Sequence, residues 1–429
     1  MTMDPGVSDA QAVIRRRGVA AAAVAAAGIV FLAAVLRQEG VPKLSTLWAE
    51  DGAVFLQCGY LGSPLVCVGQ AYQGYLHIVP RLISLVAVSL PPSAVAATIG
   101  LLAALVAALA AAVVAWSIAD LTRSPLAGVI GASGLALVWQ AGREVLGNTA
   151  NLHWVLVAAT LVAIGCAWLG GRISMASIAL AVAACLTSGF APVVVLAGGI
   201  AALLRRPRAA TLCLASGAAT AIQLAIELTT GRSAAGATPI PLRDVTEFMR
   251  HEVIRNGFFG DVPLAVGLVV PALLAATLIG LVVATTDRRR TARTIAVVLA
   301  MVGAGLGLCV LSILVNRALN PRYAYLPAAM TIAALGVAAG ILARDLAGPV
   351  GRFGRAAPAV LPVVAIILGI GFGASFRLES RASAGPDVPS EIAEAAAHCS
   401  QAATVTIFIS PRPASTEWSL RIPCELIAP

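Results

Sequence analysis

The chain has 429 residues, of which 59% are hydrophobic and only 11% are charged, and its formal net charge is +9. So little polar surface excludes a soluble globular protein, and the composition predicts a polytopic membrane protein. The basic residues are scattered over the loops without interleaved aromatic residues, which argues against a nucleic-acid-binding protein.

The first apolar run, residues 18–36, follows three arginines, Arg15–Arg17. It is long enough to cross a bilayer and continues into residues 37–39 without a cleavage site of small residues. We therefore expect an uncleaved transmembrane helix whose N-terminus is cytoplasmic.

Ten further apolar segments are candidates for membrane spans. With the first run, the expected spans are residues 18–36, 93–119, 126–140, 152–169, 173–187, 191–204, 210–229, 262–285, 294–315, 324–342 and 358–375. Arginines in the short loops orient them. The sequence therefore predicts an all-α multi-pass protein of the cytoplasmic membrane, with about 11 transmembrane helices, a cytoplasmic N-terminus and an extracytoplasmic C-terminus.

One more apolar segment, residues 75–90, carries His77, Pro80 and Arg81 and stops at two prolines. If it crossed the membrane, the arginine-rich segment 205–208 would lie outside. We therefore expect a juxtamembrane helix in the outer interface, within a first outer loop of residues 37–92. Residues 230–261 are expected to form a second outer loop with a helix on the membrane surface.

Residues 376–429 form the only long polar stretch, so the chain divides into a transmembrane domain, residues 1–375, and a small extracytoplasmic domain. A helix at 389–398 and strands at 404–409 and 418–422 are expected there. Four of the eight cysteines fall outside the expected spans, all on the outer side. An oxidising compartment would allow two disulfides, Cys58 with Cys67 and Cys399 with Cys424.

Two adjacent carboxylates, Glu50 and Asp51, follow the first span within the stretch Trp48–Phe55. An acidic pair in an outer loop is often a solvated turn. It can also supply a general base, because a carboxylate accepts the proton of a hydroxyl nucleophile. A neighbouring carboxylate is expected to raise the pKa of Asp51, which suits a base working near neutral pH.

The order of these motifs resembles the GT-C fold glycosyltransferases over the first two hundred residues. Asp51-Gly52-Ala53-Val54-Phe55 resembles the Asp-x-x-x-aromatic element that follows their first span, and an outer juxtamembrane helix and an Asn-rich outer turn, residues 142–154, come next. Some members have a Lys-Pro pair before the juxtamembrane helix, whereas here Arg81 follows Pro80.

The resemblance implies an inverting hexosyl- or pentosyltransferase, such as a mannosyltransferase or an arabinosyltransferase. Its donor would be a polyprenyl-phosphate sugar and its acceptor a cell-envelope glycan or glycolipid on the outer face of the membrane. Asp51 would be the general base, with Glu50 as its neighbour or alternate. A divalent cation, Mg²⁺ or Mn²⁺, is left open as a cofactor, and the spacing of Cys, His and acidic residues indicates no metal site.

Cations that stabilise the leaving phosphate are needed for this chemistry. We expect Arg81, His77 and Arg322, with the adjacent Tyr323, to bind the donor phosphate. Each cation could instead anchor a helix end at the lipid headgroups.

The outer turn offers candidates for binding the acceptor or the sugar: Arg143, Asn148, Asn151, His153 and Trp154. Amides and imidazole could hydrogen-bond sugar hydroxyls. An asparagine could equally cap the helix that follows, and Trp154 could belong to the interfacial aromatic belt.

Two other function classes remain alternatives. A transporter or flippase for lipid-linked sugars predicts broken helices with charges at the bilayer midplane in repeated halves, which the sequence lacks. A membrane acyltransferase acting on envelope glycans requires a catalytic His or Ser constellation, which no spacing here recommends.

Overall fold

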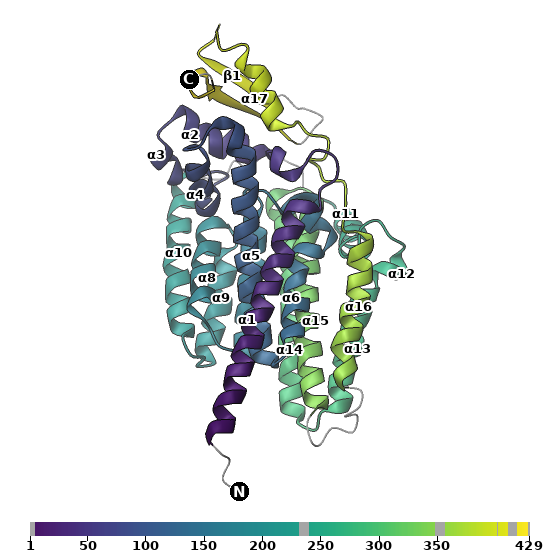
Figure 1. Ribbon diagram of the computed structural model, residues 1–429. Coiled ribbons are helices and arrows are strands. Elements are labelled where there is room, and N and C mark those ends of the chain that lie inside the picture. The colour runs from purple at the N-terminus through teal and green to yellow at the C-terminus, as the bar shows by residue number, and fades with distance from the viewer. Residues whose placement is uncertain (1–4, 231–239, 348–356, 401, 411–417, 428–429) are drawn as a thin grey trace.

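The computed structural model describes residues 5–230, 240–347, 357–400, 402–410 and 418–427. Most of them form helices that run side by side in one bundle, and a small two-stranded sheet with one short helix lies at one end (Figure 1). The first helix, α1 (Pro5–Leu36), begins at the opposite end.

Helices form at all eleven expected span positions, and six helical segments of the described chain are long and apolar enough to cross a membrane. The six contain α1, α5 (Val95–Thr122), α10 (Ala209–Thr230), α13 (Val269–Ala284), α14 (Arg288–Asn316) and α15 (Tyr325–Leu346). The other five are shorter: α6 (Pro125–Leu137), α7 (Leu152–Trp168), α8 (Met175–Thr187), α9 (Ala191–Leu203) and α16 (Ala357–Ala374).

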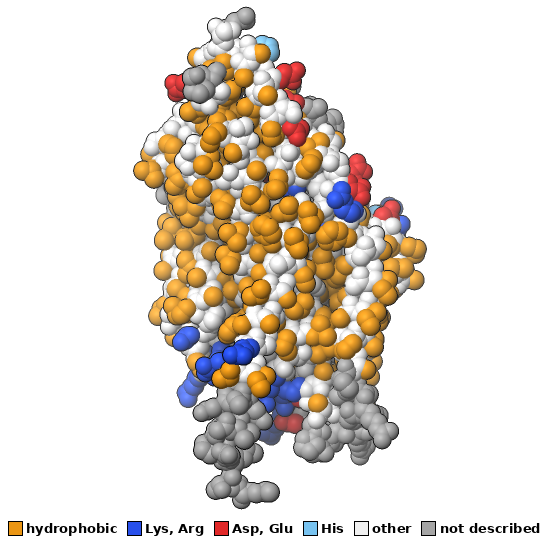
Figure 2. All heavy atoms as spheres, viewed as in Figure 1, with side chains coloured by type: hydrophobic (Ala, Val, Ile, Leu, Met, Phe, Trp, Pro, Cys, Tyr) orange, Lys and Arg blue, Asp and Glu red, His pale blue; other side chains and the backbone are white. Residues whose placement is uncertain are grey.

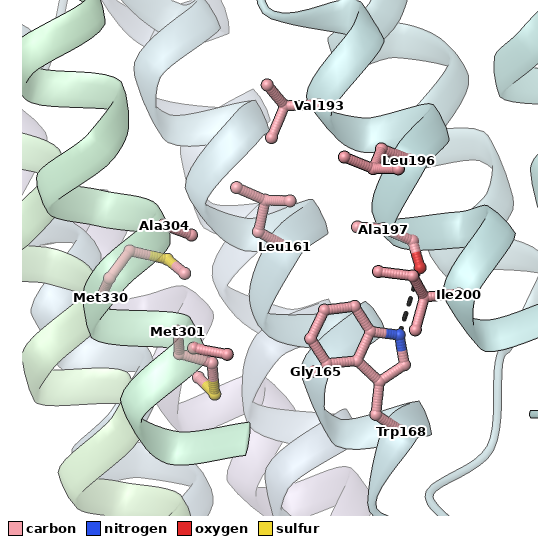
Figure 3. A pocket seen from close by; sticks show the side chains of 11 residues that line it. Leu161, Gly165, Trp168, Val193, Leu196, Ala197, Ile200, Met301, Ala304 and Met330 are labelled. Carbon is pink, nitrogen blue, oxygen red and sulfur yellow. Dashed lines mark hydrogen bonds between the residues drawn. The ribbon is translucent and has the colours of Figure 1, made fainter. Parts of the chain in front are cut away.

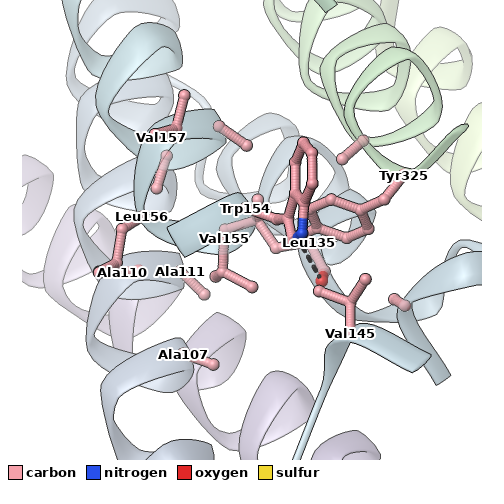
Figure 4. Packing of buried hydrophobic residues seen from close by; sticks show 14 of the residues in the cluster. Ala107, Ala110, Ala111, Leu135, Val145, Trp154, Val155, Leu156, Val157 and Tyr325 are labelled. Atoms are coloured by element: carbon pink, nitrogen blue, oxygen red, sulfur yellow. Dashed lines mark hydrogen bonds between the residues drawn. The ribbon is translucent and has the colours of Figure 1, made fainter. Parts of the chain in front are cut away.

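The core of the bundle forms around α15, which is almost wholly buried against α5, α6, α7, α13 and α14. Small residues allow the helices to pack closely: Ala107, Ala110 and Ala111 of α5 face α7 (Figure 4). A hydrogen bond joins α15 to α6, where the Tyr325 hydroxyl donates to the Leu135 carbonyl at 3.0 Å. The outer surface of the bundle is also largely apolar. Hydrophobic side chains cover the sides of the bundle, and Lys and Arg gather at the end where α1 begins (Figure 2).

Short helices cover the other end of the bundle. They are α2 (Gln57–Leu61), α3 (Pro64–Val68), α4 (Ile78–Ala87), α11 (Leu242–Phe248) and α12 (Leu264–Gly267), with the π-helical turns η2 (Asp51–Leu56), η4 (Ala141–Val145) and η5 (Met249–Arg255). The expected juxtamembrane helix is therefore present as α4 but shorter than predicted. Gln223 of α10 fixes the backbone just before α4, because its side chain accepts from Leu76 N at 2.8 Å and donates to Leu76 O at 3.2 Å.

The C-terminal segment forms α17 (Val388–Ala396) and the antiparallel pair β1 (Thr404–Phe408) and β2 (Ser419–Pro423), in the predicted order. Both predicted disulfides, Cys58–Cys67 and Cys399–Cys424, are present. The unit packs on the first outer loop, where Ser410 N donates to Leu47 O at 3.1 Å.

Candidate functional site

Asp51 is fully buried at the start of η2, where its carboxylate holds the turn that precedes α7. Thr149 donates to it from its backbone N at 3.1 Å and from its hydroxyl at 2.6 Å, and Ala150 N donates at 2.9 Å. These bonds join residues about one hundred positions apart. The carboxylate predicted to be the base is therefore engaged within the protein and closed to solvent.

The electrostatic environment of Asp51 is set mainly by burial. Burial raises the pKa of Asp51 to about 6, although the bonds from Thr149 and Ala150 and the nearby Lys43 lower it. The upward direction agrees with the prediction, but its cause is burial and not Glu50. Burial also lowers the pKa of Lys43 to about 8. Sequence reasoning missed Lys43, whose side chain packs on Gly147, a position with φ of +74° and no room for a Cβ.

This buried carboxyl predicts a pH dependence of stability. Because the folded-state pKa of Asp51 lies above that of an unfolded aspartate, the folded protein keeps a proton that the unfolded chain releases between about pH 4 and pH 6. Stability should therefore fall as the pH rises through this window, and Asp51→Asn should remove that part of the fall. The measurement is thermal unfolding of both proteins in detergent at pH 4.5 and pH 7. The same pH dependence in both would assign it to other groups.

Glu50 differs from its neighbour. It is half-buried, and its Oε2 is buried without a hydrogen-bond partner among the described residues. Its charge acts on two side chains of the same region. Burial and then Glu50 raise the pKa of Tyr72. Burial alone would lower the pKa of Arg322, but Glu144 and then Glu50 raise it. Of the two carboxylates, Glu50 is therefore the one with an oxygen that no described residue hydrogen-bonds, so a bound ligand could donate to it.

Arg81 lies in the first turn of α4 and is only 3% exposed. Its guanidinium carbon is 5.0 Å from the centroid of the Phe55 ring, and its Nε and Nη1 have no hydrogen-bond partner in the described chain. Burial lowers its pKa to about 10, so the group remains charged at neutral pH. A buried guanidinium with free donors is costly unless an anion completes it.

Arg322 lies in η6 (Pro321–Ala324) and pairs only partly with an acid. Its Nη1 is 3.5 Å from Glu144 Oε1, and its Nε is buried without a hydrogen-bond partner in the parts of the chain described. The guanidinium carbon lies 5.9 Å from the centroid of the Tyr323 ring. We call Glu50, Arg81, Glu144 and Arg322 the polar cluster.

A row of aromatic rings connects the two arginines. Centroid distances along it are 5.4 Å for Phe55–His77, 4.1 Å for His77–Tyr75, 6.4 Å for Tyr75–His153, 4.7 Å for His153–Trp154 and 5.7 Å for Trp154–Tyr323. We call these six residues the aromatic row. Phe55 and Tyr75 were not predicted as site residues. Four of the six side chains are buried, and Tyr75 and His153 are half-buried, so these two rings have faces on which a sugar can stack.

His77 does not fit its predicted role. Its Nδ1 lies 3.2 Å from Tyr75 O, which can only accept, so Nδ1 carries the proton and Nε2 is an acceptor. Burial, with His153 and Arg81 nearby, lowers the pKa of His77 to about 3. A neutral ring with an acceptor at Nε2 cannot donate to a phosphate. His153 has the same tautomer, because its Nδ1 lies 2.9 Å from Ala150 O.

The two asparagines predicted to bind the acceptor are used inside the turn. Asn148 Nδ2 and Asn151 Nδ2 donate to Glu144 O at 2.7 and 3.1 Å, and Asn148 Oδ1 accepts from Asn151 N at 3.0 Å. Both are buried. Asn151 is the N-cap residue of α7, but its side chain makes no cap hydrogen bond, so both amides hold the turn at Glu144 and do not cap the helix. Arg143 contributes its backbone carbonyl, which accepts from Arg381 N.

Trp154 keeps a free donor in the aromatic row, since its Nε1 is buried and unpartnered within the described residues. An apolar cavity of about 130 Å³ lies elsewhere, between α7, α9, α14 and α15, beside Trp168 at the other end of α7 (Figure 3). Its nearest lining residue on α7, Leu161, is seven residues from Trp154, or roughly 10 Å at 1.5 Å per residue, and no lining residue belongs to the polar cluster. Among the described residues, no group of three or more His, Cys, Asp or Glu side chains could hold a metal ion.

Comparison with known proteins gives no family assignment. No protein-family model matches the chain, and a search of curated proteins finds no similar one. Any functional inference therefore depends on the geometry of the polar cluster and the aromatic row.

Proposed function

We propose that this protein is an inverting glycosyltransferase of GT-C type that moves a sugar from a polyprenyl-phosphate donor to a cell-envelope glycan or glycolipid on the outer face of the membrane. One observation carries the proposal: groups of opposite charge, the buried Arg81 and the half-buried Arg322 and Glu50, each keep buried polar atoms without a partner among the described residues. Native proteins rarely leave such atoms unsatisfied, and a bound ligand explains them.

A lipid-linked phosphosugar has the chemistry that these groups require. Its phosphate accepts hydrogen bonds from guanidinium nitrogens, which Arg81 and Arg322 have to offer. Its sugar ring matches the aromatic row, and its lipid tail suits a site at the end of an apolar bundle. Guanidinium groups also stabilise the charge of the prenyl phosphate as it leaves.

Within this reaction we assign the general base to Glu50. A base needs a free oxygen to take the proton that it removes, whereas the Asp51 carboxylate is bonded to Thr149 and Ala150. Glu50 Oε2 has no such partner. In the reaction, the anomeric carbon loses its bond to the phosphate oxygen and gains one to the acceptor oxygen, whose proton goes to Glu50. Asp51 then fixes the outer turn that carries His153 and Trp154.

We further propose that all eleven helices at the expected positions cross the membrane. The five shorter ones are 13 to 18 residues long, and four of them, α6 to α9, follow one another in the chain. Local thinning of the bilayer and snorkelling of flanking residues accommodate such lengths. This arrangement puts the polar cluster and the C-terminal unit on the outer side and the N-terminus in the cytoplasm.

Cysteine accessibility tests this topology. Single cysteines at Ser124 and Arg289 should resist an impermeant thiol reagent in intact cells, whereas one at the exposed Glu379, just after α16, should react. The parent protein, whose free cysteines lie within helices, is the background control. Labelling of Ser124 in intact cells would contradict the eleven-span arrangement.

The enzymatic part of the proposal is tested by release of prenyl phosphate from a synthetic prenyl-phosphate sugar by the purified protein. This readout needs no knowledge of the natural acceptor, because envelope glycans can be supplied as a mixture. If the protein consumed none of the hexosyl and pentosyl donors tried, the result would count against the proposal.

A further inference from the structure

The segment between α16 and α17, residues 376–387, lies against the first outer loop. Leu378 N donates to Arg37 O, and Val41 N donates to Ser383 O, both at 3.0 Å. Figure 1 shows this segment passing from α16 to α17 beside the loop. Backbone bonds of this kind fix the position of the side chains that the segment presents.

One of these side chains, Arg381, reaches the polar cluster. Its Nη1 is 3.1 Å from Glu144 Oε1, and its guanidinium carbon lies 5.8 Å from the centroid of the Trp48 ring. Its backbone N donates to Arg143 O at 3.3 Å. Arg381 therefore touches the turn that holds Glu144 and the tryptophan two residues before Glu50.

Glu144 is shared between two arginines. Arg381 and Arg322 both approach its Oε1, at 3.1 and 3.5 Å, and the Glu144 side chain is only 1% exposed. A carboxylate that binds two cations holds each less tightly than it would hold one alone. Arg322, the more distant of the two, thus keeps part of its hydrogen-bonding capacity for another anion.

We propose that Arg381 is a positioning residue of the donor site: by sharing Glu144 it keeps Arg322 available to the donor phosphate. The inference deepens the proposed function and rests on it. It also gives the C-terminal segment a role in the reaction, because the segment supplies a charge that the transmembrane bundle lacks at this position.

A purely structural role makes a different prediction. Arg381 is 46% exposed, and an ion pair made only for stability would change unfolding without changing ligand affinity. The positioning role instead predicts that the effect of Arg381 depends on Glu144. Without Arg381, Glu144 should draw Arg322 closer and weaken phosphate binding, whereas without Glu144 the loss of Arg381 should matter little.

A double-mutant cycle on the full chain distinguishes these roles. The probe is a synthetic prenyl monophosphate, and its Kd is measured for wild type, Arg381→Gln, Glu144→Gln and the double variant, together with each Tm. Arg377→Gln, an exposed arginine of the same segment, is the matched control for lost charge. Arg381→Gln should raise the Kd about tenfold with little change in Tm, and Arg381→Lys should recover part of the affinity.

The Arg381→Gln substitution should change the Kd less than about twofold in the Glu144→Gln background. Equal effects in both backgrounds would show that Arg381 acts independently of Glu144 and would overturn the inference. A Kd unchanged by Arg381→Gln would overturn it too. So would a loss of affinity in Arg381→Gln no larger than the loss in Arg377→Gln. A wild type that binds no prenyl monophosphate would overturn the proposed function itself, whereas binding without dependence on Arg381 overturns only the inference.

Discussion

Replacing Glu50 by Gln is expected to lower prenyl phosphate release by about 10² to 10⁴ at unchanged donor affinity, because the amide cannot take the acceptor proton. The Tm should stay close to that of wild type, since Glu50 is half-buried and its Oε2 makes no hydrogen bond within the described chain. The assay is release of prenyl phosphate from a synthetic donor, with donor binding measured separately.

Asp51→Asn is the matched comparison, because it changes the neighbouring carboxylate in the same way. The Asn side chain can accept through one oxygen only, and its amide nitrogen would face donors of Thr149 or Ala150. We expect a lower Tm and a smaller, partial loss of turnover. If Asp51→Asn folded normally but were inactive while Glu50→Gln remained active, the general base would be Asp51 and not Glu50.

Replacing Arg81 by Met should weaken donor binding by roughly 10- to 150-fold, since a charge-assisted phosphate contact contributes about 1.5 to 3 kcal/mol. The same substitution should leave the Tm unchanged or raise it. Arg81 is 3% exposed and two of its nitrogens have no partner among the described residues, so Met removes an uncompensated buried charge while filling similar space. Gain of stability with loss of binding is the signature of a residue kept for a ligand.

The measurements for Arg81→Met are the Kd for prenyl monophosphate and thermal unfolding, with Arg250→Met on η5 as control. Arg250 is exposed, so its replacement should change neither by much. Equal losses of binding at Arg81 and Arg250 would indicate a general effect of charge at the membrane surface. A large fall in Tm for Arg81→Met alone would identify a structural arginine.

Features that depend on local pattern were predictable from the sequence. Apolar length located the eleven helices, and the four cysteines outside the apolar runs formed the two predicted disulfides. Both properties can be read without knowledge of packing. Helix ends were less accurate: α4 covers residues 78–87 and not 75–90, since Gln223 of α10 holds the backbone at Leu76 in a non-helical turn.

The partners of each charged residue were not predictable, because they come from distant parts of the chain. Asp51 meets Thr149, Arg81 meets Phe55, and Glu144 meets both Arg322 and Arg381. Adjacent residues of a helical turn point in different directions, so the pattern Glu50-Asp51 could not indicate which carboxylate is enclosed. Arg381 carried no signal at all, since an arginine in a polar segment is ordinarily solvated.

The central claim is that the polar cluster binds the phosphosugar, and it is tested most directly by a structure of Glu50→Gln with a bound prenyl-phosphate sugar. The account predicts the phosphate within hydrogen-bond distance of Arg81 and Arg322, with the sugar against the aromatic row and its anomeric carbon facing residue 50. Donor phosphate bound elsewhere, such as on the α11 and η5 surface, with Arg81 still unpartnered, would contradict it.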